Sequence, residues 1–337
     1  MPIRFLAPLG LGLTLASGAM ADAPRVATDI APVHSLVARV MQGAGAPDVL
    51  VRPGASPHGY AMRPSEAAAL EAADLVFGMG EGLTPWLEGA IDSLAAEAHV
   101  VALLGAADSR VLPFREGVEF AAHDHGDDHA EKEHAHDAHA EKEAGHEEAH
   151  THDHDHGHED AHAHDGADPH AWLDPANATA WLGLIAEELA EHDPANAALY
   201  AANAETAAAE IAALSAEIAA QLAPVQDTPF LVFHDAYQYF EVAFGVTAAG
   251  AIALSDAVAP GPARIAALRE MAEARGVACV FSEPQFDPKL VETVFGDVAA
   301  HGVLDPMGSQ VAMGPGHYPQ MLREMAGAMV ACLGGAS

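Results

Sequence analysis

The chain has 337 residues, half of them hydrophobic, and carries 49 acidic side chains against 14 basic ones, a formal net charge of −35. Such an acidic balance argues against binding to nucleic acids or anionic lipids and favours cationic ligands. The length is sufficient for two domains, each with a hydrophobic core of its own.

Residues 1–21 have the features of a secretory signal peptide. Arg4 supplies the positive charge, the following run to Ala16 is apolar and uncharged, and Ala19-Met20-Ala21 is a small-x-small cleavage site. The apolar run is too short to span a bilayer, although an uncleaved anchor remains the alternative. We therefore expect an exported chain that begins near Asp22 and carries no cysteine for lipid attachment at the cleavage site.

After the signal peptide, short apolar runs alternate with helical patterns as far as residue 104. The predicted strands are 25–30, 48–51, 75–77 and 100–104, and the predicted helices are 33–41, 65–73 and 86–96. Alternation with short connections predicts a mostly parallel sheet with helices on both faces. We place this first α/β lobe at residues 22–193.

The segment 122–165 interrupts the first lobe and holds fourteen of the 22 histidines together with fifteen acidic residues. It has too few apolar side chains for a core, so we expect an exposed, disordered loop; a helix confined to its middle part is the alternative. Imidazoles and carboxylates are metal ligands, which makes this loop a candidate for several weaker metal sites. The candidate ligands are His123, His125, His129, His134, His136, His139, His146, His150, His152, His154, His156, His158, His162 and His164.

A long linking helix is predicted at 194–223. The segment has no glycine and no internal proline, alanine is its commonest residue, and leucine and isoleucine recur at helical spacing. Asp193 is the predicted cap and Pro194 the first helical residue. At 1.5 Å per residue the helix would be roughly 40 Å long, a stiff connection between two lobes.

The second α/β lobe is predicted at residues 224–337. Its strands are expected at 230–233 and 277–281, and its helices at 236–244, 265–275, 289–295 and 318–333. The two cysteines of the chain, Cys279 and Cys332, both lie here. A single disulfide is the default in an exported chain, and two buried free thiols are the alternative.

Four side chains outside the histidine-rich segment are the strongest candidates for a metal site: His58, His170, His234 and Asp305. Each lies where an apolar run or strand ends, and open α/β sheets place their ligand crevice at the ends of strands. Two come from each lobe. Three imidazoles and one carboxylate would form a closed tetrahedral set suited to zinc.

Each of these residues also has a purely structural interpretation. A single histidine after a strand is more often a capping or surface residue, which is how we interpret His34, His99, His192, His301 and His317. Asp174 and Asp235 fit helix N-caps equally well. His146-Glu-Glu-Ala-His150 matches the H-E-x-x-H pattern of zinc proteases, but histidine and glutamate are so frequent around it that a chance match is expected.

The local contexts of the four candidates resemble the metal-binding proteins of bacterial ABC importers, and within that family the zinc-specific, ZnuA-type members. The motifs are Gly54-Ala-Ser-Pro-His58, Pro169-His170-Ala-Trp-Leu173, Phe233-His234-Asp-Ala-Tyr237 and Leu304-Asp305-Pro306. The resemblance extends over essentially the whole mature chain. It implies two lobes, each with a four-stranded parallel sheet flanked by helices, joined by one long rigid helix, with zinc in the cleft between them.

The same resemblance implies that His58, His170 and His234 bind zinc, with Asp305 as a fourth ligand that water replaces in some members. It also implies a Cys279–Cys332 disulfide. Zn(II) would be the transported ligand, and the partners would be a membrane permease and its ATPase, with a periplasmic zinc chaperone as a further candidate. We expect a monomer in the periplasm with no enzymatic activity.

Three other functions are alternatives to zinc transport. Manganese-type relatives carry glutamate where this chain has His234, and imidazole in that place favours Zn²⁺ over Mn²⁺. A metal-dependent adhesin is a second alternative. A zinc hydrolase is a third, and it would need an open coordination position and a base such as Glu283 or Asp235. For the histidine-rich segment, zinc capture or sensing and simple metal buffering both stay open.

Overall fold

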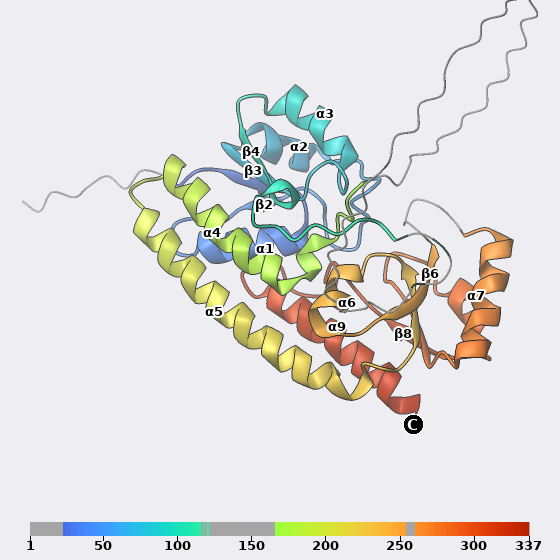
Figure 1. The fold of residues 1–337 in the computed structure, drawn as a ribbon. Coiled ribbons are helices and arrows are strands. Elements are labelled where there is room, and N and C mark those ends of the chain that lie inside the picture. Colours follow the sequence, from blue (N-terminus) through green and yellow to red (C-terminus); the bar gives the residue numbers. More distant parts are fainter. Residues whose placement is uncertain (1–22, 116, 118–119, 121–165, 254–259, 337) are drawn as a thin grey trace, which may run out of the picture.

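The computed structural model describes residues 23–115, 117, 120, 166–253 and 260–336 (Figure 1). The predicted signal peptide lies outside these residues. So does the histidine-rich segment 122–165 with its fourteen candidate ligands.

Two four-stranded parallel sheets form the centre of the fold. The first has the strand order β2-β1-β3-β4 and the second β6-β5-β7-β8, and every pairing within them is parallel. The strands are β1 (Val26–Thr28), β2 (Asp48–Val49), β3 (Leu75–Gly78), β4 (His99–Ala102), β5 (Phe230–His234), β6 (Ala248–Ala253), β7 (Cys279–Ser282) and β8 (Ala300–Val303). This architecture confirms the predicted fold class.

Helices connect the strands in each half. They are α1 (Ala31–Val40), α2 (Pro64–Glu71), α3 (Pro85–Leu94) and α4 (Pro175–His192) in the first, and α6 (Gln238–Phe244), α7 (Pro262–Arg275), α8 (Lys289–Phe295) and α9 (His317–Leu333) in the second. Proline begins α2, α3, α4 and α7, where its missing N–H is not needed. Asp174 caps α4 by accepting a hydrogen bond from the Ala176 amide at 2.8 Å, as its structural interpretation predicts.

The long helix α5 (Ala197–Leu222) connects the two halves and packs against α1, α4 and α9 (Figure 1). It begins three residues later than predicted. Asp193 does not cap it, because residues 193–196 form a turn in which the Asp193 carboxylate accepts hydrogen bonds from Asn196 Nδ2 and Tyr200 Oη. By length and composition 197–225 resembles a membrane-crossing helix, but one face, including Ile211 and Leu214, is buried inside the fold.

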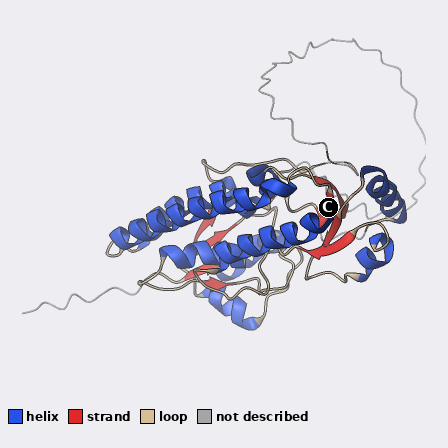
Figure 2. Ribbon diagram, turned by 90° about the horizontal axis from the view of Figure 1, so that it is seen from below, coloured by secondary structure: helices blue, strands red, loops and turns tan. Residues whose placement is uncertain are grey.

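One hydrophobic core extends through both halves. It contains residues of β1, α1 and α4 from the first half, buried residues of α5, and residues of β5, α6 and α9 from the second. Seen from below in Figure 2, long helices lie in front of strands of both sheets. The Cys279–Cys332 disulfide joins β7 to α9, which confirms the predicted pairing. The shared core and the helix α5, which packs against helices of both halves, therefore fix the position of one sheet relative to the other.

Candidate metal centre

Three histidines meet between the two sheets. His58 lies in the loop after β2, His170 directly precedes the 3-10 turn Ala171–Leu173 before α4, and His234 is the last residue of β5. One nitrogen of each imidazole lies within 4.8 Å of the others, and the ring of His170 is centred 5.5 Å from that of His58 and 5.3 Å from that of His234. Among the histidine, cysteine, aspartate and glutamate side chains of the described residues, these three lie close enough together to hold one ion.

The three ligand candidates differ in exposure. His170 and His234 are buried, and His58 is partly exposed. Of the three candidates, His58 is therefore the one in contact with solvent.

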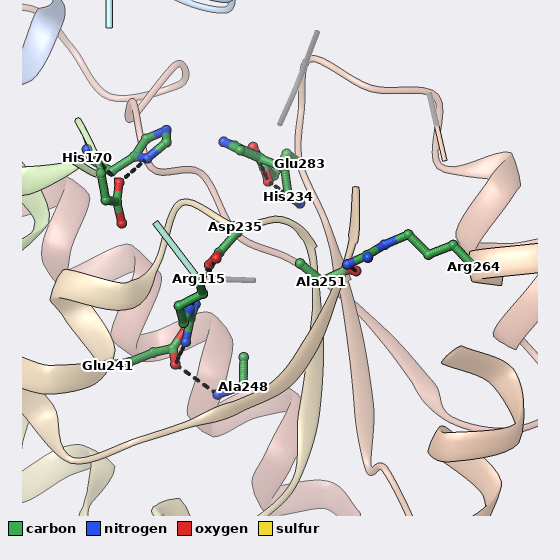
Figure 3. A network of polar contacts seen from close by, with 10 residues as sticks. Arg115, His170, His234, Asp235, Glu241, Ala248, Ala251, Arg264 and Glu283 are labelled. Atoms are coloured by element: carbon green, nitrogen blue, oxygen red, sulfur yellow. Dashed lines mark hydrogen bonds and ion pairs between the residues drawn. The ribbon is translucent and has the colours of Figure 1, made fainter. Parts of the chain in front are cut away.

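Buried carboxylates bind the inner nitrogens of two of the imidazoles. Asp168 Oδ1 lies 2.7 Å from His170 Nδ1. Glu283 Oε1 lies 2.5 Å from His234 Nδ1 (Figure 3). When these carboxylates are ionised they only accept, so Nδ1 of each ring then carries the proton and donates it. Nε2 is then the nitrogen of each ring that would bind a cation. Histidines that bind metals are commonly oriented in this way.

Two buried carboxyl groups lie next to the imidazoles, and burial disfavours their charged form. Burial raises the pKa of Asp168 to about 7, opposed by the hydrogen bond from the His170 amide, and burial raises the pKa of Asp235 to about 6, opposed by the hydrogen bond from Arg115. A divalent cation held by neutral imidazoles would favour the ionised form of both carboxylates. The same mutual attraction stabilises the bound cation.

Asp305 is placed differently from the three histidines. It follows β8, and its carboxylate oxygens accept hydrogen bonds from the Met307 amide at 3.1 Å and from the Ser309 amide and hydroxyl, both at 2.6 Å. These bonds close the turn 305–309. The structure does not bring Asp305 into the three-histidine group, so its role as a fourth ligand stays a prediction.

The remaining described histidines have structural partners. His99 pairs with Glu188, His192 contacts the Glu188 carbonyl near the end of α4, and His301 contacts the Ser282 hydroxyl. The capping-or-surface interpretation is wrong for His34 and His317. Both are buried in the core, where their Nε2 atoms contact the carbonyls of Pro47 and Met307.

The carboxylate partners were not recognised from the sequence. Asp168 stands two residues before His170, directly before the motif 169–173, and Glu283 directly follows β7, the neighbour of β5 in the sheet. Neighbouring parallel strands end at the same edge, so Glu283 belongs beside His234. That topology was the signal that could have identified it.

A family model described as "Zinc-uptake complex component A periplasmic" (ZnuA) matches residues 26–332. The chain belongs to this family. It is 44% identical over 330 residues to the "High-affinity zinc uptake system protein ZnuA" of Brucella abortus (strain 2308), a match that covers 98% of this chain and 97% of the relative. The protein of the same name from Paracoccus denitrificans (strain Pd 1222) is 45% identical over 323 residues, covering 95% of each chain.

Solved structures share the fold of this ZnuA-family chain. "Crystal structure of ZnuA" superposes with a TM-score of 0.69 at 23% identity and covers 93% of this chain and 100% of that one. The nickel complex of the binding protein FpvC from P. aeruginosa superposes with a TM-score of 0.70 at 20% identity, covering 94% and 98%. At these identities the likeness shows the fold alone.

The carboxylates behind the imidazoles should matter for metal affinity. We expect Glu283→Gln to lower zinc affinity about 10- to 100-fold. A glutamine amide would hold the His234 ring less firmly than the carboxylate does, and the substitution also removes a negative charge next to the site. Competition with a chromophoric chelator measures the change. Asp297→Asn, which alters an exposed carboxylate paired with Arg269, is the control, and equal affinities for the two variants would contradict the assignment.

Proposed function

We propose that this protein captures Zn²⁺ through Nε2 of His58, His170 and His234 and passes it to the membrane permease of an ABC importer, driven by the associated ATPase. The observation that carries the proposal is the meeting of three imidazoles from both halves of the fold, two of them fixed by buried carboxylates. Membership of a periplasmic zinc-uptake family and relatives named as zinc uptake proteins support it.

The chemistry of the ligands favours zinc. Three neutral imidazoles form a borderline-soft set that suits Zn²⁺ better than Mn²⁺, which prefers carboxylate oxygens. The fourth position is taken by water or by Asp305 once the turn 305–309 opens. A manganese carrier is the less favoured alternative, because no carboxylate belongs to the ligand group formed by the described residues.

The site is poorly equipped for hydrolysis. Glu283, one candidate base, contacts the His234 ring through Oε1 and accepts a hydrogen bond from Gln285 through Oε2. Asp235, the other, is bound by the Arg115 guanidinium. A carboxylate with both oxygens engaged is a weak candidate for activating water. We therefore propose binding and release of zinc as the whole activity.

The route to the site completes the proposal. Residues 1–21 direct export and are cleaved, and the mature chain acts as a monomer in the periplasm. A periplasmic zinc chaperone is a further candidate donor or acceptor. The histidine-rich segment 122–165 supplies weaker sites that either collect zinc or buffer it.

Uptake of radioactive zinc tests the proposal. Cells that lack their own copy should take up ⁶⁵Zn from zinc-poor medium when supplied with the wild-type gene, but not with His170→Ala, because the cleft site is lost. Uptake of ⁵⁴Mn should be unaffected by either gene. Restoration of zinc uptake by His170→Ala, or of manganese uptake by the wild type, would refute the proposal.

A further inference from the structure

A short segment, 112–115, connects the surroundings of His170 to those of His234. At its beginning, the Leu112 carbonyl accepts a hydrogen bond from the Asp168 amide at 2.8 Å. Tyr239 Oη accepts from the Leu112 amide at 2.9 Å and donates to the Asp168 carbonyl at 2.8 Å. The backbone of Asp168, whose carboxylate orients His170, is therefore held between this segment and α6.

The segment ends at Arg115, which binds two buried carboxylates of the second half (Figure 3). Its Nε lies 3.1 Å from each Asp235 oxygen, Nη1 lies 2.7 Å from Glu241 Oε2, and Nη2 lies 2.9 Å from Glu241 Oε1. The guanidinium is largely buried and lies over the Phe120 ring, 3.9 Å from its centre. A planar fork with several donors suits such two-carboxylate binding, and lysine cannot reproduce it.

Both carboxylates belong to the structure that carries His234. Asp235 is the next residue after His234 in the junction between β5 and α6. Glu241 lies on α6, and its Oε2 accepts a hydrogen bond from the Ala248 amide of β6 at 3.1 Å. Arg115 thus holds the end of β5, the helix after it and the edge strand β6 in one arrangement.

We infer that 112–115 is a brace that sets the spacing of His170 and His234, and that Arg115 is a positioning residue for zinc binding. The inference rests on the proposed ligand assignment. One end of the brace holds Asp168, the partner of His170, and the other end holds Asp235, the residue after His234. The four residues between these ends therefore set the distance between the two imidazoles, whose ring centres lie 5.3 Å apart. Without the guanidinium, the carboxylates of Asp235 and Glu241 would repel one another and displace the junction that carries His234.

The test compares Arg115→Gln and Arg115→Lys with the wild type in the full chain. Zinc affinity is measured by chelator competition, and the site geometry is read from the visible spectrum of the protein loaded with one equivalent of Co²⁺. We expect Arg115→Gln to lower zinc affinity about 10- to 100-fold, as loss of ligand orientation does elsewhere. The Co²⁺ bands should shift, because the ligand field follows the position of His234. Arg115→Lys keeps the charge and should restore affinity only in part.

Arg264→Gln is the matched control. Arg264 is another partly buried arginine near β6, and one of its donors binds the Ala251 carbonyl (Figure 3). Its other donors bind the carbonyls of Ile252 and Gly117, and among the described residues it donates to no carboxylate. This variant should lower thermal stability and leave the Co²⁺ spectrum and zinc affinity unchanged. If Arg115→Gln does not fold, Arg115→Lys decides, since it retains the buried cation.

The outcomes separate the inference from the assignment beneath it. If His234→Ala removes the Co²⁺ bands while both Arg115 variants keep the wild-type spectrum and affinity, the positioning role is wrong and the ligand set stands. Equal spectral shifts in the Arg115 and Arg264 variants would also overturn it, because they would indicate general destabilisation. If His234→Ala leaves the bands intact, the ligand assignment itself fails.

Discussion

Replacing His234 by alanine should lower zinc affinity about 10²- to 10³-fold. Four-ligand zinc sites in small domains bind with about 10–16 kcal/mol, or about 2.5–4 kcal/mol per ligand, and each 1.4 kcal/mol is a factor of ten. His234 is buried and its Nδ1 is bound to Glu283, and no fourth histidine, cysteine or carboxylate belongs to the ligand group formed by the described residues. The variant also leaves the Glu283 carboxylate buried without its imidazole partner.

Competition with a chelator of known affinity measures this loss at one equivalent of zinc, where the tightest site fills first. His301→Ala is the control. It removes a histidine of the same half that contacts only the Ser282 hydroxyl among the described hydrogen bonds. A His234→Ala protein that still competes as strongly as His301→Ala would show that the tight site lies elsewhere in the chain.

Loss of the Cys279–Cys332 disulfide should lower the free energy of unfolding by about 4 kcal/mol. The two cysteines are 53 residues apart in sequence, and closing a loop of that length in the unfolded chain has roughly this entropic effect. Both cysteines lie in elements that pack against other parts of the fold. Cys279 is the first residue of the central strand β7, and Cys332 lies on α9, which also packs against α1 and α5. We expect α9 to loosen first in the reduced protein.

Urea unfolding of the Cys279→Ala/Cys332→Ala protein tests this prediction, with unfolding of the wild type in reducing agent as an independent measurement. Zinc affinity of the folded variant should stay unchanged, because Cys279 is at the opposite end of β7 from Glu283. A loss below about 1 kcal/mol would contradict the loop-closure argument.

Sequence patterns predicted the elements whose apolar residues have a clear period. β5 (Phe-Leu-Val-Phe-His) and the leucine–isoleucine repeat of α5 are examples. β6 (Ala-Ala-Gly-Ala-Ile-Ala) and β8 (Ala-His-Gly-Val) were not predicted, since alanine and glycine have little strand preference and tertiary pairing alone makes them strands. Helix α4 was not among the predicted helices, although the N-cap interpretation of Asp174 indicated its start. Its residues Trp181, Leu182, Ile185 and Leu189 also follow a helical period.

His58 and His234 were predictable because His58 follows a strand and His234 ends one, and open α/β sheets place their ligands at strand ends. His170 instead directly precedes the 3-10 turn before α4, so its motif and not a strand end identified it. Their carboxylate partners were harder to find. Glu283 is 49 residues from His234, and their contact exists only because β5 and β7 are neighbours. Arg115 and Glu241 carry no pattern of their own, and only the tertiary structure brings them together. Asp305 follows an apolar run, as expected of a ligand at a strand end, but its carboxylate closes the turn 305–309.

A crystal structure of the zinc-loaded protein, with anomalous diffraction recorded at the zinc absorption edge, tests the central claim most directly. We predict one strong anomalous peak between the two sheets, about 2.0–2.1 Å from Nε2 of His58, His170 and His234. A strong peak elsewhere, with the three imidazoles binding no ion, would contradict the account.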